Sequence, residues 1–231
     1  MKKILVLITI LVLSLCLVAC GEPASPLNMI KEGIVRCDTS LIVGENDSMR
    51  IELLSYYERG EDVAKCPENM SPNNVILKLM PKDIKNTPAT YSVVLKDVSG
   101  EKNTELSLKK DILGMSFSTH VSPDIITFDV ASAEVKVGEE TVSMDMVDVL
   151  KNAKIQCKDA VEIGYSELEK CLETYFDNNK YTGTAEVKLI HNNKDLSSPY
   201  YIYVTFCKDN DNYLSCLIDP SSGVVVNKKT K

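Results

Sequence analysis

The sequence predicts a mainly β protein with an α+β part. An N-terminal antiparallel β-sandwich over residues 34–155 is followed by a small module of one helix on an antiparallel sheet over residues 156–231. Two observations predict this fold class. Apolar and polar residues alternate between residues 34 and 142, and after a stretch with the apolar period of a helix the alternation returns near residue 185. Clusters of Gly, Pro, Asn, Asp and Ser separate the alternating runs, as they do between short antiparallel strands.

The first twenty residues combine a charged start, an apolar run and a cysteine motif. Two lysines precede the apolar run 4–18, and Leu17-Val18-Ala19-Cys20 stands at its end. This arrangement resembles the signal peptide of bacterial lipoproteins, with the four residues in the pattern of the lipobox. Cys16 fits the pattern less well because the bulky Leu15 precedes it. The alternative is an ordinary signal peptide or a buried helix with a stray cysteine.

The lipoprotein resemblance has consequences for location. It implies a signal peptide at residues 1–19, a diacylglyceryl group on the thiol of Cys20, and a protein held at a bacterial cell membrane or outer membrane, outside the cytoplasm. Residues 20–33, which contain Pro23, Ser25 and Pro26, are then expected to form a tether between the lipid and the folded part.

The predicted strands of the sandwich have apolar residues at every second position. These positions are Ile51-Leu53, Val75-Leu77-Leu79, Tyr91-Val93-Leu95, Leu106-Leu108, Leu113-Met115-Phe117, Ile126-Phe128-Val130 and Val135-Val137. Seven or eight short strands with no long helix between them are typical of a sandwich, here Ig-like only in architecture because the chain has no Trp. Ser143 is expected to cap a short helix over 144–153, which places the domain boundary near residue 155.

The second module begins with a predicted amphipathic helix. Ser166-Glu-Leu-Glu169 has the pattern of a capping box. Apolar residues at helical spacing follow, namely Leu168, Cys171, Leu172, Tyr175 and Phe176. Three or four strands are predicted after the helix, over 185–191, 200–207, 213–219 and 224–227.

This order of elements resembles a PepSY-like or cystatin-like module. Residues 217–225, LIDPSSGVV, are similar to the Asp-x-x-x-Gly-x-Val ending of PepSY modules. The resemblance implies a secreted module that regulates peptidases or holds a partner and has no catalytic residues of its own.

Six further cysteines are expected to form disulfides, since an even number in an exported chain favours pairing. A symmetric hairpin between 200–207 and 213–218 would bring two of them directly opposite each other. The expected pairs are Cys207 with Cys216, Cys157 with Cys171, and Cys37 with Cys66. Free buried thiols are the alternative, and the lack of CxxC or HxxxH spacing argues against zinc or a thioredoxin-like site.

No pattern in the sequence predicts catalysis, a metal site or a cofactor. A P-loop, a Rossmann glycine fingerprint and HExxH are all missing from the sequence. The two histidines, His120 and His191, lie beside predicted turns, where histidines are more often surface residues than catalytic bases. A net charge of −7 argues against nucleic acid as the main partner.

The tyrosines suggest a binding surface. Ten tyrosines stand against four phenylalanines, and the strand that starts near residue 200 would carry Tyr201 and Tyr203 on one face and an apolar core on the other. That face either contacts a partner or is buried against the sandwich.

We therefore expect a membrane-anchored, non-catalytic binding protein of the bacterial cell envelope. Its partner would be another envelope protein, a peptide or a wall polymer. A regulatory or inhibitory module for a secreted peptidase is the alternative, and a hydrolase with an unrecognised site is the third hypothesis.

Overall fold

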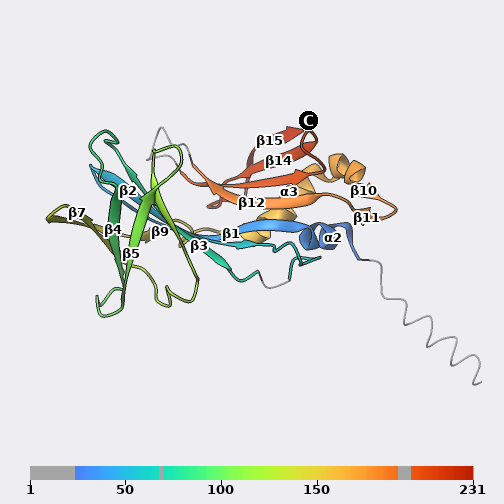
Figure 1. The fold of residues 1–231 in the computed structure, drawn as a ribbon. Coiled ribbons are helices and arrows are strands. Elements are labelled where there is room, and N and C mark those ends of the chain that lie inside the picture. Colours follow the sequence, from blue (N-terminus) through green and yellow to red (C-terminus); the bar gives the residue numbers. More distant parts are fainter. Residues whose placement is uncertain (1–23, 68–69, 192–198, 231) are drawn as a thin grey trace, which may run out of the picture.

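The computed structural model describes residues 24–67, 70–191 and 199–230, and in these ranges the chain is mainly β (Figure 1). The predicted lipobox with Cys16 and Cys20 lies outside the described residues. A group of strands with β4, β5 and β7 forms one end of the molecule, and the two helices lie with the last strands at the other end. The long strands β1 and β2 connect the two ends.

Over the described residues, the secondary structure confirms a mainly β protein with one long helix. In chain order the elements are α2 (Pro26–Glu32), β1 (Ile34–Glu45), β2 (Met49–Glu58), β3 (Asn74–Pro81), β4 (Thr90–Lys96), β5 (Asn103–Lys110), β6 (Phe117–Val121), β7 (Ser132–Val137), β8 (Glu140–Asp145), β9 (Val147–Asp148), α3 (Cys157–Leu172), the 3₁₀ turn η1 (Glu173–Tyr175), β10 (Phe176–Asp177), β11 (Lys180–Tyr181), β12 (Thr184–Ile190), β13 (Tyr201–Cys207), β14 (Tyr213–Ile218) and β15 (Val225–Thr230).

Thirteen strands form one sheet in the order β15-β14-β13-β12-β1-β2-β3-β6-β5-β4-β7-β8, with β9 paired to β1. The return of β9 to β1, with Val147 opposite Val43, curls the first eight strands around a common interior. Most neighbours are antiparallel, but β1 and β12 run parallel, with Cys37 opposite Val187. This parallel pair joins the sandwich to the strands of the second module.

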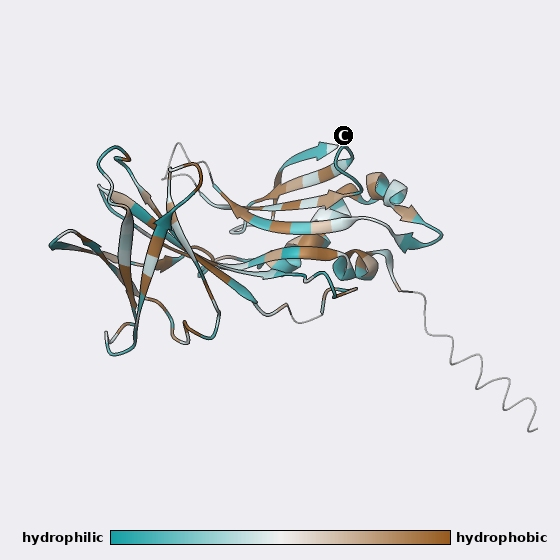
Figure 2. Cartoon of the chain, viewed as in Figure 1, coloured by the Kyte–Doolittle hydropathy of each residue, from teal (hydrophilic) through white to brown (hydrophobic). Residues whose placement is uncertain are grey.

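Two separate cores lie on the sheet. Hydrophobic and hydrophilic residues alternate along many strands in Figure 2, which gives these strands one buried face. The sandwich core contains Leu77, Leu95 and Phe117, each fully buried. The second core lies under α3, where Val204 and Phe206 of β13 are buried.

The second core draws on more of the chain than residues 156–231. Ile30 of α2, Cys37 of β1 and Tyr57 of β2 are buried in it. α3 begins at Cys157, close to the predicted boundary near residue 155, but the module that it covers is completed by strands and a helix from the N-terminal third of the chain.

Two predictions about helices are wrong. Residues 144–153 form β8, β9 and a turn instead of a helix, because Met144 and Met146 point into the sandwich core two residues apart. α3 begins nine residues before Ser166 (166 − 157 = 9), since Ala160, Val161 and Gly164 extend its buried face toward the N-terminus. The hydroxyl of Ser166 donates to the carbonyl of Glu162 inside the helix and caps nothing.

The predicted tether and one predicted strand are also different. Residues 26–32 form α2, whose N-terminus is capped by Ser25: the side-chain oxygen accepts from Asn28 N at 3.2 Å. The burial of Ile30 fixes this helix to the second core. Residues 126–130 form no strand, although Val130 is buried and Phe128 packs against the sandwich core.

Candidate functional site

Helices cover one face of the second module's sheet, and neither α2 nor α3 packs on the other face. The helices α2 and α3 both pack into the core on one face, where Ile202, Val204 and Phe206 are fully buried. Tyr201 and Tyr203 alternate with these residues and are half-buried on the opposite face. The sequence left open whether this tyrosine face is exposed, and the structure gives it partial exposure.

The strand register defines what surrounds the two tyrosines. Tyr203 lies opposite Lys188 of β12, and Tyr201 lies opposite Ile190. On β1 and β2 the same face carries Asp38 opposite Tyr56, and Arg36 opposite Glu58. We call this surface the open face; it comprises Arg36, Asp38, Tyr56, Glu58, Glu186, Lys188, Tyr201 and Tyr203.

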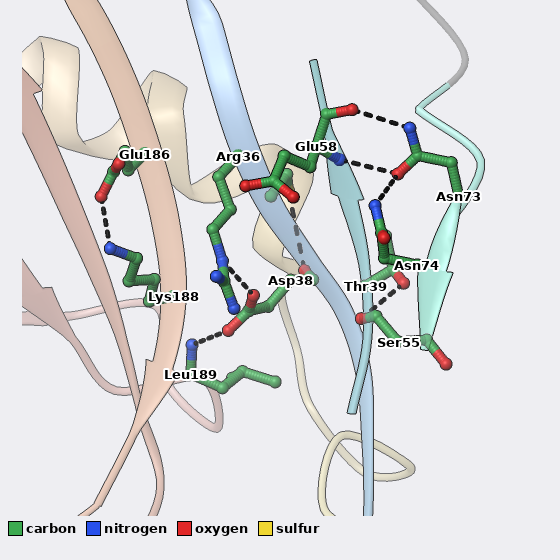
Figure 3. Close-up of polar contacts among 11 residues, drawn as sticks. Arg36, Asp38, Thr39, Ser55, Glu58, Asn73, Asn74, Glu186, Lys188 and Leu189 are labelled. Atoms are coloured by element: carbon green, nitrogen blue, oxygen red, sulfur yellow. Dashed lines mark hydrogen bonds and ion pairs between the residues drawn. The ribbon is translucent and has the colours of Figure 1, made fainter. Parts of the chain in front are cut away.

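A buried carboxylate lies at the centre of the open face (Figure 3). Asp38 is only 2% exposed and accepts hydrogen bonds from Leu189 N at 2.9 Å and from Arg36 Nε at 3.2 Å. Burial raises the pKa of Asp38, and these two contacts oppose the rise. The carboxylate therefore connects β1 to β12 from the side that no helix covers.

Aromatic and charged groups stack on this centre. The guanidinium carbon of Arg36 lies 4.2 Å from the ring centroid of Tyr56, close enough for a cation–π contact. Lys188 forms an ion pair with Glu186 on the same strand. At the far edge, the side-chain amide of Asn73 accepts a hydrogen bond from Glu58 N at 2.8 Å and donates one to Glu58 O at 2.7 Å (Figure 3). The open face thus presents tyrosines between fixed charge pairs, an arrangement suited to contact with a partner.

The predicted disulfides are not present, and two of them are excluded by geometry. Cys207 lies opposite Tyr213, and Cys216 lies opposite Val204, so the two thiols point to different faces of the sheet. The hairpin is symmetric about residue 210, and not about the midpoint that the sequence suggested. Cys157 and Cys171 lie at the two ends of α3, roughly 21 Å apart at 1.5 Å per residue, which is too far for a disulfide.

The two cysteines of the third expected disulfide lie in the same core but form no disulfide. Cys37 and Cys66 are both buried in the core under α3, near Cys157. Burial is the main cause that raises the pKa of the Cys37 thiol to about 12, and it raises the pKa of Cys66 and Cys157 as well. Thiols of this kind stay protonated and behave as small apolar side chains.

Sequence reasoning missed the charged residues that organise this surface. Arg36 and Asp38 occupy strand positions where the apolar pattern required no apolar residue, and the sequence gives no sign that a charged side chain at such a position is buried. His191 was predicted to lie at the surface beside a turn. It is half-buried and stacks on Tyr200, with ring centroids 4.8 Å apart.

Comparisons of the chain with known protein families, with characterised proteins and with solved structures found no match. Within the described ranges, no helix has the length and apolar character needed to cross a bilayer. The same ranges contain no group of three or more His, Cys, Asp or Glu side chains arranged to hold a metal ion.

Proposed function

We propose that the protein is a lipid-anchored, non-catalytic binding protein of the bacterial cell envelope, and that the open face is the surface that contacts its partner. The observation that carries the proposal is the one-sided cover of the sheet. Both helices pack on one face, while Tyr201 and Tyr203 on the other face remain half-exposed. The lipobox at Leu17-Val18-Ala19-Cys20 supplies the anchor in this proposal.

The chemistry of the open face favours an envelope protein or a peptide as the partner. Tyrosine contributes a large apolar ring and a hydroxyl, and it loses little conformational entropy on binding. Asp38 and Arg36 are already held by Leu189 and Tyr56, so the charges need no reordering when a partner arrives.

The test compares a double tyrosine variant of the open face with a single tyrosine variant on the covered side. A peptide selected from a display library against the full chain is titrated into wild type, the double variant Tyr201→Ser/Tyr203→Ser, and the control Tyr165→Ser, which lies on α3 on the covered side. Loss of two contact tyrosines is expected to weaken binding roughly tenfold or more. Equal affinity for the double variant and wild type would remove the open face from the proposal.

Anchoring is tested separately by intact mass of the protein extracted from native membranes. The expected mass is that of the chain from residue 20 with a diacylglyceryl group. A Cys20→Ala variant should leave the membrane fraction. An unmodified chain would refute the anchor and leave the open face to be judged by its own titration.

A second candidate is regulation of a secreted peptidase. The described order of elements, α3 followed by the four strands β12 to β15, is the order that the PepSY-like or cystatin-like resemblance implies. This candidate predicts that the purified protein slows a co-exported peptidase and is not itself cleaved. Unchanged peptidase rates with a saturating amount of protein would argue against it.

A further inference from the structure

A cavity of about 380 Å³ lies on the outer side of β2 and β3, between the turn 111–116 and the end of β12. Arg50 in this cavity and Tyr56 of the open face lie on the same side of β2, three pleats apart. The lining residues are Arg50, Lys78, Met80, Pro81, Lys82, Asp111, Leu113, Met115, Ser116 and His191. The lining thus joins three cationic side chains and one carboxylate to several apolar groups.

Arg50 is the most buried of the three cations, with 3% exposure. Its Nε donates to Glu52 at 2.8 Å and its Nη1 lies 3.4 Å from Glu45, which also pairs with Lys82 at 3.0 Å. Nη2 of Arg50 has no hydrogen-bond partner among the described residues. Two carboxylates behind Arg50 therefore fix the guanidinium but leave one of its donors unused.

Two more unused polar atoms lie beside this donor. Tyr200 packs its ring 5.5 Å from the guanidinium carbon of Arg50 and stacks on His191. The hydroxyl of Tyr200 and Nε2 of His191 are buried and, like Nη2 of Arg50, have no partner in the described part of the chain. Burial first, and then the charge of Arg50, lowers the pKa of His191. A neutral imidazole still has one N–H to donate.

Buried polar atoms without partners are rare because each has lost its hydrogen bonds to water without a replacement. Two of the three atoms, on Arg50 and His191, belong to side chains that line the cavity, and both can donate a hydrogen. They indicate a place for a hydrogen-bond acceptor. The carboxylate of Asp111 does not fill it. That group accepts from the Ser116 hydroxyl at 2.6 Å and from Met115 N at 2.9 Å, within its own turn.

The opposite wall of the cavity is apolar. Met80 lies on β3, and Leu113 and Met115 project from the turn with 81% and 62% exposure. A ligand with an apolar group next to its anionic group would cover these side chains. A volume of about 380 Å³ is at the small end of the range for ligand pockets.

We propose that this cavity binds a carboxylate that adjoins an apolar group, and specifically the C-terminus of a peptide with an apolar last residue. The inference rests on the proposed binding function, because a peptide held here by its C-terminus can continue along β2 onto the open face. The carboxylate supplies the acceptor that Arg50 and His191 lack, with Lys78 as a further cation. Leu113 and Met115 contact the last side chain.

The test uses two peptides that differ in one group. N-acetyl-Ala-Ala-Ala-Leu is titrated into the full chain by calorimetry as the free acid and as the C-terminal amide. Because charge-assisted hydrogen bonds are lost in the amide, the acid is expected to bind at least about tenfold more tightly. Equal affinity for the two peptides, or no binding of either at millimolar concentration, would overturn the proposal.

Octanoate tests whether the carboxylate comes from a fatty acid instead of a peptide. It has the carboxylate and an apolar chain but no peptide groups. Tighter binding of octanoate than of the free-acid peptide would overturn the assignment to a peptide C-terminus and indicate a fatty acid. Weaker binding supports the peptide.

Variants are chosen to avoid unfolding, since Arg50 holds two buried ion pairs. Lys78→Gln is expected to weaken binding of the free-acid peptide roughly tenfold and to leave binding of the amide unchanged. Lys78→Arg should restore binding of the free acid. Lys109→Gln, on exposed β5, is the matched control. An equal loss for the acid and the amide in Lys78→Gln would contradict the proposal.

The two proposals can fail separately. The Tyr201→Ser/Tyr203→Ser variant removes open-face contacts but leaves the cavity, so the ratio of acid to amide affinity should not change. If the variant bound the free acid and the amide with equal affinity, the claim that the cavity alone selects the carboxylate would be contradicted.

Discussion

Asp38 shows how a single residue can hold two parts of the sheet together. Its carboxylate is on β1, but its partner Leu189 N is on β12, 151 residues further along the chain. Without the carboxylate, Leu189 N and the guanidinium of Arg36 would be left near the junction with no acceptor. Arg36 would also lose the contact that holds it over Tyr56.

We expect Asp38→Ala to lower the free energy of unfolding by roughly 2–4 kcal/mol, because it removes one partner of a buried ion pair and a backbone hydrogen bond. Asp38→Asn, which can still accept from Leu189 N, should lose less. Urea denaturation of both variants and wild type at pH 7 measures the difference. A loss below 1 kcal/mol for Asp38→Ala would contradict this role.

The pKa of Asp38 also determines how the stability difference between wild type and Asp38→Asn changes with pH. The folded pKa of Asp38 is raised above its unfolded value of about 3.8, so folding favours the protonated form. The stabilisation from protonation is fully present below the unfolded pKa and is lost as pH rises through the folded pKa. The gap in unfolding free energy between wild type and Asp38→Asn should therefore widen as pH falls from 7 toward 4. A gap that narrows over this range would contradict the direction of the shift.

At the scale of elements, α3 depends on a close approach to β13. A Cβ on Gly164 would lie 3.2 Å from Phe206 Cε2 and 3.3 Å from Val204 Cγ1. Glycine is unfavourable within helices, so its presence here reflects the short distance between helix and sheet. The residue sits in the middle of the buried face, between Val161 and Leu168.

Gly164→Val is expected to lower the free energy of unfolding by roughly 1–3 kcal/mol, since a branched side chain has no room against Phe206. The control is Lys170→Val, which introduces the same residue at an exposed position of α3. Thermal unfolding followed by circular dichroism compares the two. A larger loss for the control would show that helix propensity, and not packing, sets the stability.

The sequence predicted elements well where one face of a strand is buried and the other is wet. The strands around Val75-Leu77-Leu79 and Tyr91-Val93-Leu95 lie where alternation indicated. The start of α3 was missed because Ala160 and Gly164 are small and do not register as an apolar stripe. Met144 and Met146 were taken into a helix because short apolar runs fit both periods.

At the scale of the whole molecule, β1 and β2 belong to both cores. β2 contributes Ile51 and Leu53 to the sandwich core and Tyr57 to the core under α3. β1 pairs with β2 on one side and with β12 on the other. Pairing between residues so distant in sequence leaves no local pattern. The sequence therefore predicted the tyrosine face of one strand, but not the residues of β1 and β2 that complete the open face, nor the sharing of these strands between two cores.

We expect residues 156–230 not to fold without the rest of the chain. The fragment would lack Ile30, Cys37 and Tyr57 from its core and would expose the edge of β12 that pairs with β1. Amide dispersion in a ¹H–¹⁵N spectrum distinguishes a folded fragment from an unfolded one, with residues 24–230 as the control. A well-dispersed spectrum of the fragment would show that the smaller module is independent.

The position of helix α2 limits the distance between a lipid on Cys20 and the folded part of the chain. If Cys20 carries the lipid, four residues lie between it and Ser25, and the five steps of the chain from Cys20 to Ser25 span at most about 18 Å. From Ser25 onward the chain is fixed to the folded body by the burial of Ile30. The end of the folded body that carries α2 would thus stay close to the lipid headgroups. A partner that binds close to α2 would therefore have to come near the membrane surface.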